Sequence, residues 1–114
     1  MIATRRDLLW WSFHSNGNVA LVDALVAAAP GVGRSLYITD IVFSADASAA
    51  INLFFEEGAI IVLGPWYLTP APVNSNLALH FQTPKRITPN TALTVTTSAG
   101  ILQSLDVSGF IGGA

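Results

Sequence analysis

The sequence predicts an all-β protein, an antiparallel β-sandwich or jelly roll of about seven or eight strands. Two observations carry this prediction. Apolar residues recur with a period of two in several short segments, which places alternate side chains on opposite faces of a strand. Proline, glycine and asparagine, which favour turns, separate these segments. A single closed barrel is the alternative architecture.

The clearest strands lie in the second half of the chain, at residues 77–82, 93–97 and 105–111. In these segments apolar residues occupy alternate positions, and the β-branched and aromatic residues among them fit a half-buried pleated surface. Proline and asparagine in 83–86 and 88–91 predict turns between these strands.

Strands are also predicted in the middle of the chain. Segments 51–56 and 59–63 form a hairpin with its turn at 56–58. Segment 35–45 is apolar on both predicted faces, with Leu36, Ile38 and Val42 on one and Tyr37, Ile41 and Phe43 on the other. Such strands belong to sheets that are covered on both sides, and here we expect another subunit to supply the second cover.

Two segments near the N-terminus are ambiguous. Residues 19–29 fit either a strand or a helix, and the all-β context favours the strand. Residues 1–18 form either a first strand or an N-terminal docking arm, and residues 19–114 a single β-sandwich domain. The first segment concentrates large apolar residues at Leu8, Leu9, Trp10, Trp11 and Phe13.

The chain is poor in charge. Of its 114 residues, 11% are charged and 52% hydrophobic, whereas ordinary soluble domains have about 25% charged residues. This balance excludes a disordered chain, and a net charge of −2 argues against a nucleic-acid partner. We therefore expect much of the surface to be buried against other protein, with the chain itself as the first partner.

A membrane segment is not expected. A spanning helix needs about 20 mostly apolar residues, and the best candidate, 19–32, is interrupted by Asp23 and Pro30. The short apolar stretch after Arg5 and Arg6 also makes a poor secretory signal. The chain contains no cysteine, so it has no disulfide framework.

No catalytic motif is present, and we expect no enzyme activity, no cofactor and no metal. His14 and His80 are the two histidines, and nothing in the sequence pairs either with a nucleophile. Adjacent Glu56 and Glu57 fit a solvated turn better than a calcium site. Asp40, in an apolar strand, is expected to form an ion pair, with the possible partners Arg34, Lys85 and Arg86.

The aromatic residues are expected to anchor protein contacts. Trp10, Trp11, Trp66 and Tyr67 are the candidates for a sugar-stacking platform, but Trp10 and Trp11 would point to opposite faces of a strand. Tryptophan and tyrosine are enriched at the energetic centres of interfaces. The predicted interface residues are Leu8, Leu9, Trp10, Trp11, Phe13, Tyr37, Ile41, Phe43 and Trp66.

Several segments between Val19 and Ile111 together resemble a known family. They are residues 30–44 with the run Tyr-Ile-Thr-Asp-Ile, residues 81–87, residues 91–96, and the closing 105–110. This pattern is similar to that of the small head decoration (cement) proteins of tailed bacteriophages.

The resemblance implies a β-sandwich or jelly-roll fold and no catalytic residues. It also implies a homotrimer on the outer surface of a virion capsid, with the major capsid protein as partner. The alternative is a binding module of a phage tail, fibre or head fibre that recognises a glycan on the host surface.

Overall fold

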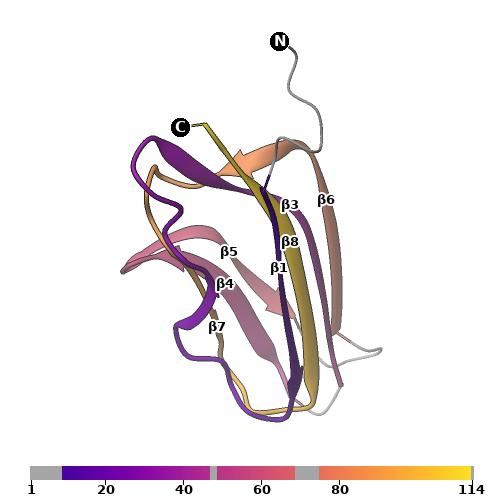
Figure 1. Ribbon diagram of the computed structural model, residues 1–114. Coiled ribbons are helices and arrows are strands. Elements are labelled where there is room, and N and C mark those ends of the chain that lie inside the picture. The colour runs from indigo at the N-terminus through magenta and orange to yellow at the C-terminus, as the bar shows by residue number, and fades with distance from the viewer. Residues whose placement is uncertain (1–8, 47–48, 69–74, 114) are drawn as a thin grey trace.

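A computed structural model describes residues 9–46, 49–68 and 75–113, and within these ranges the chain is all-β. Its eight strands form two four-stranded antiparallel sheets, which confirms the predicted β-sandwich and excludes a single closed barrel (Figure 1). The strands are β1 (Leu9–Gly17), β2 (Ala24–Ala27), β3 (Arg34–Ala45), β4 (Ile51–Glu57), β5 (Ile60–Leu68), β6 (Ser75–Arg86), β7 (Leu93–Thr97) and β8 (Gln103–Gly113).

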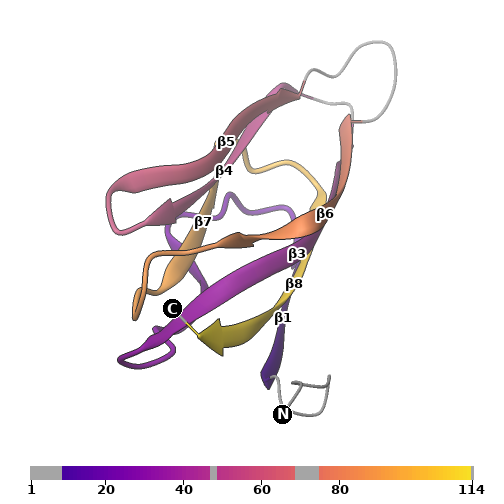
Figure 2. The same cartoon turned by 90° about the horizontal axis from the view of Figure 1, so that it is seen from above.

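The strand order is that of a jelly roll. Sheet A has the order β1-β8-β3-β6 and sheet B has the order β2-β7-β4-β5. The antiparallel pairs β1·β8, β2·β7, β3·β6 and β4·β5 are nested, as if one long hairpin had been rolled up. Seen from above, the two sheets form separate layers that face each other (Figure 2).

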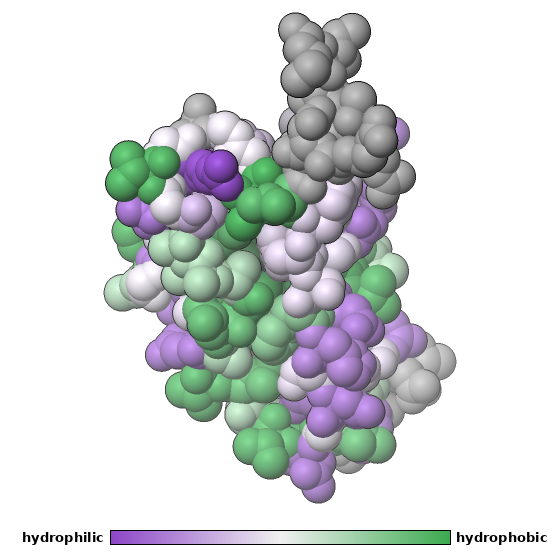
Figure 3. All heavy atoms as spheres, in the orientation of Figure 1, coloured by the Kyte–Doolittle hydropathy of each residue, from purple (hydrophilic) through white to green (hydrophobic). Residues whose placement is uncertain are grey.

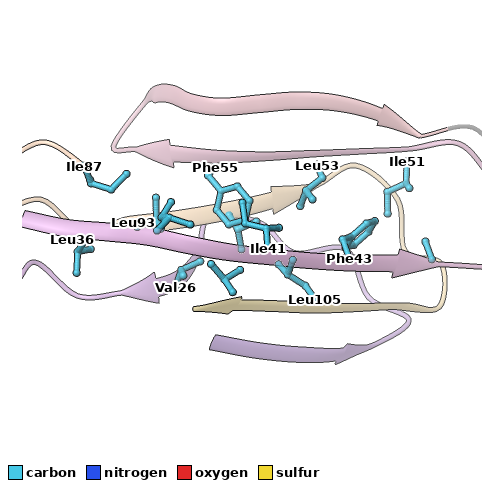
Figure 4. Packing of buried hydrophobic residues seen from close by; sticks show 14 residues of the cluster. Val26, Leu36, Ile41, Phe43, Ile51, Leu53, Phe55, Ile87, Leu93 and Leu105 are labelled. Carbon is cyan, nitrogen blue, oxygen red and sulfur yellow. The ribbon is translucent and has the colours of Figure 1, made fainter. Parts of the chain in front are cut away.

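The core lies between the two sheets. Both sheets contribute large side chains that are fully buried, including Phe43 from sheet A and Phe55 from sheet B (Figure 4). The alternation predicted from the sequence holds in β4, β7 and the first half of β8, where every second residue is buried. Burial of this apolar surface is the main force that holds the layers together.

A bulge in β3 changes which of its alternate side chains point into the core. Between Ile38 and Asp40 the register of β3 shifts against both β6 and β8. Leu36 and Ile38 point into the core before the bulge, and Ile41 and Phe43 point into it afterwards. Opposite Thr39, four residues of β6 (81–84) separate the paired positions 80 and 85. Residues 83–86 are therefore an irregular continuation of β6, and the prediction of a turn that ends the strand there is wrong.

The two ambiguous segments have different outcomes. Of residues 19–29, only Ala24–Ala27 form a strand, and Asp23 before it adopts a positive φ of 48°. Residues 9–17 form β1, which pairs with β8 along its whole length and is part of the sandwich. Residues 1–8 of the proposed arm lie outside the described residues. The predicted hairpin at 56–58 has a two-residue loop, with Gly58 at φ 61°.

Candidate functional site

The outer face of sheet A carries short polar side chains in cross-strand rows. The register places His14 of β1 opposite Asp106 of β8. It places Asp40 of β3 opposite both Ser108 of β8 and His80 of β6. These residues alternate with core-facing neighbours, so their side chains point away from the core. We call this surface the sheet A face; in Figure 3 hydrophilic residues gather over the lower part of β1, at its edge.

Both histidines of the chain are paired with aspartates on the sheet A face. His80 Nδ1 lies 2.7 Å from Asp40 Oδ1, and His14 Nδ1 lies 2.6 Å from Asp106 Oδ1. The hydrogen bond with His80 is the main reason why the pKa of Asp40 is lowered from its ordinary value of 3.8. Partial burial opposes this effect, and a hydrogen bond with Thr39 adds to it. The edge strands β1 and β6 are thus tied to the central strands by side chains.

The pair formed by Asp40 and His80 is not arranged as a Ser-His-Asp triad. In such a triad the serine hydroxyl faces the imidazole. Here the nearby Ser108 hydroxyl interacts with the carboxylate of Asp40, where it helps to lower the pKa. The arrangement orients a histidine, and it supplies hydrogen-bonding groups to the surface.

A row of aromatic rings crosses one end of the sheet A face. Tyr37 and Phe110 stack with ring centroids 4.8 Å apart, and Trp10 meets Phe110 edge to face at 5.5 Å. The Tyr37 hydroxyl donates a hydrogen bond to the carbonyl oxygen of Gly113. Arg86 of β6 lies opposite Tyr37 in the register and continues the row. The three rings support one another across β1, β8 and β3.

The other end of the sheet A face contains an open hollow of about 510 Å³. Four of its lining residues form one cross-strand row over all four strands, in the order Asn16, Ser104, Ser44 and Asn76. The remaining lining residues are Ala45, Asp46, Leu102 and Gln103. Gln103 Nε2 donates to the carbonyl oxygens of Ala99 and Ile101, both at 2.9 Å, while its buried Oε1 has no hydrogen-bond partner among the described residues.

β5, one of the two edge strands of sheet B, differs from the sheet A face because it is apolar. β5 contains no charged residue, and Ile60, Ile61 and Tyr67 are exposed by 67%, 45% and 71%. Ile61 lies opposite Glu56, and Tyr67 lies opposite Asn52, so both project from the outer side of sheet B. We call these three exposed residues the β5 edge.

The predicted interface residues of the N-terminal segment and Trp66 fall into two groups. Leu9 and Trp10 are exposed, and Leu8 lies outside the described residues. The other three, Trp11, Phe13 and Trp66, pack against the core of the same chain. In β1 and β5 these three side chains point toward the sandwich interior and are partly buried, so only part of each remains for a contact with another protein.

The predicted shared face of Tyr37, Ile41 and Phe43 is wrong. Ile41 and Phe43 are 0% and 1% exposed and belong to the core, whereas Tyr37 lies on the sheet A face. The bulge after Ile38 breaks the strict alternation, so residues on either side of it change faces. Val42, expected on the face of Leu36, is 51% exposed for the same reason.

The acidic residues also have other partners than expected. Asp40 pairs with His80 rather than with Arg34, Lys85 or Arg86. The carboxylate of Glu57 accepts hydrogen bonds from the backbone N–H of Thr88 at 2.5 Å and from its hydroxyl at 2.7 Å. That of Glu56 accepts one from the Thr96 hydroxyl at 3.0 Å. Both glutamates therefore tie loops and strands of this chain together, which a solvated turn does not do.

Sequence reasoning missed the hollow and both histidine–aspartate pairs. The alternation already places His14 and Asp106 on the polar faces of their strands. However, the residues of each pair lie 92 and 40 positions apart in the chain, so they meet only through the strand register. A topology of nested strand pairs would have been the signal to find them.

Within the described ranges, no cluster of three or more His, Cys, Asp or Glu residues is placed to hold a metal ion. That part of the chain also contains no helix of the length and apolarity that a membrane crossing requires. No protein family, curated protein or solved structure matches the chain.

Proposed function

We propose that the protein is a non-enzymatic structural protein of a virion, a capsid decoration protein that binds and stabilises the outer surface of a phage head as a homotrimer. The observation that carries the proposal is the uncharged, apolar β5 edge. The family resemblance of the sequence points to the same function.

Charged side chains are one of the means by which natural proteins protect the edge strands of a sheet against association. β5 has nine residues and carries no charge, and it exposes Ile60, Ile61 and Tyr67. When another protein covers exposed apolar residues of this size, removal of their surface from water stabilises the complex by about 25 cal/mol per Å². In a self-assembling protein, a second copy of the chain covers such an edge.

The geometry of β5 favours association through side chains. Pro65 has no backbone N–H to donate, and the register of β5 against β4 shifts at two places. Both features interrupt the regular backbone edge that a continuous added strand would need. Packing of Ile61 and Tyr67 against a neighbouring copy needs no such regularity.

A trimer can stabilise a capsid by a physical mechanism. Each stable contact with a capsomer buries about 1,200–2,000 Å² in total, and this area must be exposed again before capsomers separate. Three contacts on one trimer act together, so contacts that are weak singly hold strongly in combination.

Analytical ultracentrifugation of the purified full chain at micromolar concentration tests the oligomer. We expect a trimer for the wild type and a monomer for the Ile61→Lys/Tyr67→Lys variant, because two buried lysines would lack partners. Val42→Lys is the matched control, since Val42 is 51% exposed on the sheet A face and its variant should remain trimeric. A monomeric wild type, or a trimeric double variant, refutes the β5 edge as the self-association surface.

Binding to capsids tests the second half of the proposal. The wild type is added to capsids of the encoding phage that lack this protein, and occupancy is measured by sedimentation and gel densitometry. We expect saturable binding and a higher temperature of capsid disruption. Trp10→Ala tests the N-terminal contact, because Trp10 is exposed whereas Trp11 is partly buried against the core. Unchanged occupancy would remove Trp10 from the contact, and no binding by the wild type would refute decoration.

A further inference from the structure

We propose that the hollow at the Asn16–Asn76 end of the sheet A face binds a neutral saccharide. This activity would be separate from self-association, because the hollow lies on sheet A and the β5 edge on sheet B. It does not depend on where the protein sits in a virion.

The chemistry of the lining residues fits a ligand with many hydroxyl groups. Asn16 and Asn76 each offer an amide donor and an acceptor, and Ser44 and Ser104 each offer a hydroxyl that does both. Asp46 also lines the hollow. Among the residues that the structure describes, neither lysine nor arginine lines the hollow, so these side chains do not provide the cations that phosphate or sulfate groups require.

The hydrogen-bonding groups are held on a rigid support. Ser104 and Ser44 lie opposite each other on the two central strands, and each is also paired with an asparagine on an edge strand. Serine and asparagine side chains are short, so they lose little conformational freedom when a ligand binds. Preorganisation of this kind increases affinity without additional contacts.

The size of the hollow and an apolar residue in its wall also favour a saccharide ligand. About 510 Å³ lies within the range of small-molecule sites, about 300–1,000 Å³. Leu102, 57% exposed, adds an apolar surface that suits the C–H face of a sugar ring.

Gln103, one of the lining residues, has a buried acceptor that is unpaired among the described residues. Its amide orientation follows from its partners, because Nε2 donates to two carbonyl oxygens and Oε1 is left without a donor. A buried acceptor without a partner is costly. Because Gln103 lines the hollow, its side-chain amide reports on a ligand that binds there.

The neighbouring row offers room for a second sugar unit. His14 and Asp106 lie two positions along β1 and β8 from Asn16 and Ser104, on the same face. Their mutual hydrogen bond runs through the imidazole Nδ1 and holds the two side chains together. The aromatic row is about 20 Å from the hollow, six residues along β1, so a small sugar in the hollow would not reach it.

The test is a titration of the isotope-labelled full chain with maltose, lactose and chitobiose, followed by amide chemical shifts. Glycerol and sodium sulfate are titrated in parallel. We expect at least one disaccharide at millimolar concentration to shift the amides of the lining residues and the side-chain amide of Gln103, while the amide of Trp10 stays unchanged. Ser44→Ala/Asn76→Ala should weaken binding about tenfold, from the loss of two hydrogen bonds. Ser12→Ala, on the same face but outside the hollow, should leave it unchanged.

Four outcomes would overturn the proposal. They are no shift at the lining residues with any disaccharide, shifts by glycerol as large as those by the disaccharides, stronger binding of sulfate, and equal binding by the double variant and the wild type. Oligomeric state and capsid occupancy, measured on the same samples, are independent of each of these outcomes. A failure of sugar binding is therefore distinguishable from a failure of the decoration function.

Discussion

Trp11 and Gly109 lie directly opposite each other on β1 and β8, and the indole occupies the place where a side chain at position 109 would be. A Cβ atom built on Gly109 would lie 2.5 Å from Trp11 Cζ2 and would also collide with the backbone oxygen of Tyr37. The close approach allows Trp11 to pack against the core from an edge strand. A glycine in a central strand, which is otherwise unfavourable, is explained by this contact.

Gly109→Ala should therefore destabilise the protein by about 3 kcal/mol, because the backbone of Tyr37 cannot move aside as a flexible side chain would. The measurement is the free energy of unfolding in urea, with tryptophan fluorescence as the signal. Gly113→Ala is the matched control, since no described residue has an atom within 4 Å of a Cβ at that position. Equal stability of the two variants would contradict the close packing of Trp11 on Gly109.

The bulge in β3 predicts that alanine substitutions at two neighbouring residues have very different effects on stability. Phe43→Ala should cost about 3–5 kcal/mol, because the side chain is 1% exposed and its removal leaves a cavity. Val42→Ala should change stability by less than about 0.5 kcal/mol, because Val42 is half exposed on the sheet A face. Urea unfolding of both variants measures the difference. Similar costs for the two would contradict the inward position of Phe43 and the outward position of Val42 after the bulge.

The pair of Asp40 and His80 predicts a pH effect. The pKa of Asp40 is lowered in the folded protein, mainly by His80, so the stability that this carboxylate contributes is present above its ordinary pKa of 3.8. That contribution is lost as the pH falls through the lower, folded-state value. NMR titration of the Asp40 carboxyl should give a pKa below 3.8 in the wild type and a value closer to 3.8 in His80→Gln. An unchanged pKa in His80→Gln would show that another group causes the shift.

The sandwich could be predicted from the sequence because apolar and polar residues alternate along its strands. This alternation shows which face of each strand is buried. In β4 and β7, for example, every second residue is buried, and the pattern needs no knowledge of the neighbouring strands. The hairpin of β4 and β5 was equally local, since Gly58 marks its turn.

The candidate site could not be predicted, because it depends on register. The segment around Ile38 is apolar on both faces, so its sequence has no contrast that would mark the bulge. Ile41 and Phe43 were assigned to an interface because the bulge could not be recognised from the sequence. The hollow gathers Asn16, Ser44, Asn76 and Ser104, which belong to four strands and share no local motif. Polar residues of this kind are common in strands and turns, so only their pairing makes them informative.

Glu57 is expected to hold the loop between β6 and β7 in place, since its carboxylate accepts both hydrogen bonds that Thr88 offers, one from the backbone and one from the side chain. Glu57→Ala should destabilise the protein by about 1 kcal/mol and should speed hydrogen exchange at the Thr88 amide. Thr88→Val removes the hydroxyl but keeps the backbone N–H, so it should cost less. Because the two residues share this contact, the double variant should lose less stability than the sum of the single variants. Additive costs and an unchanged exchange rate at Thr88 would show that the loop is held by other contacts.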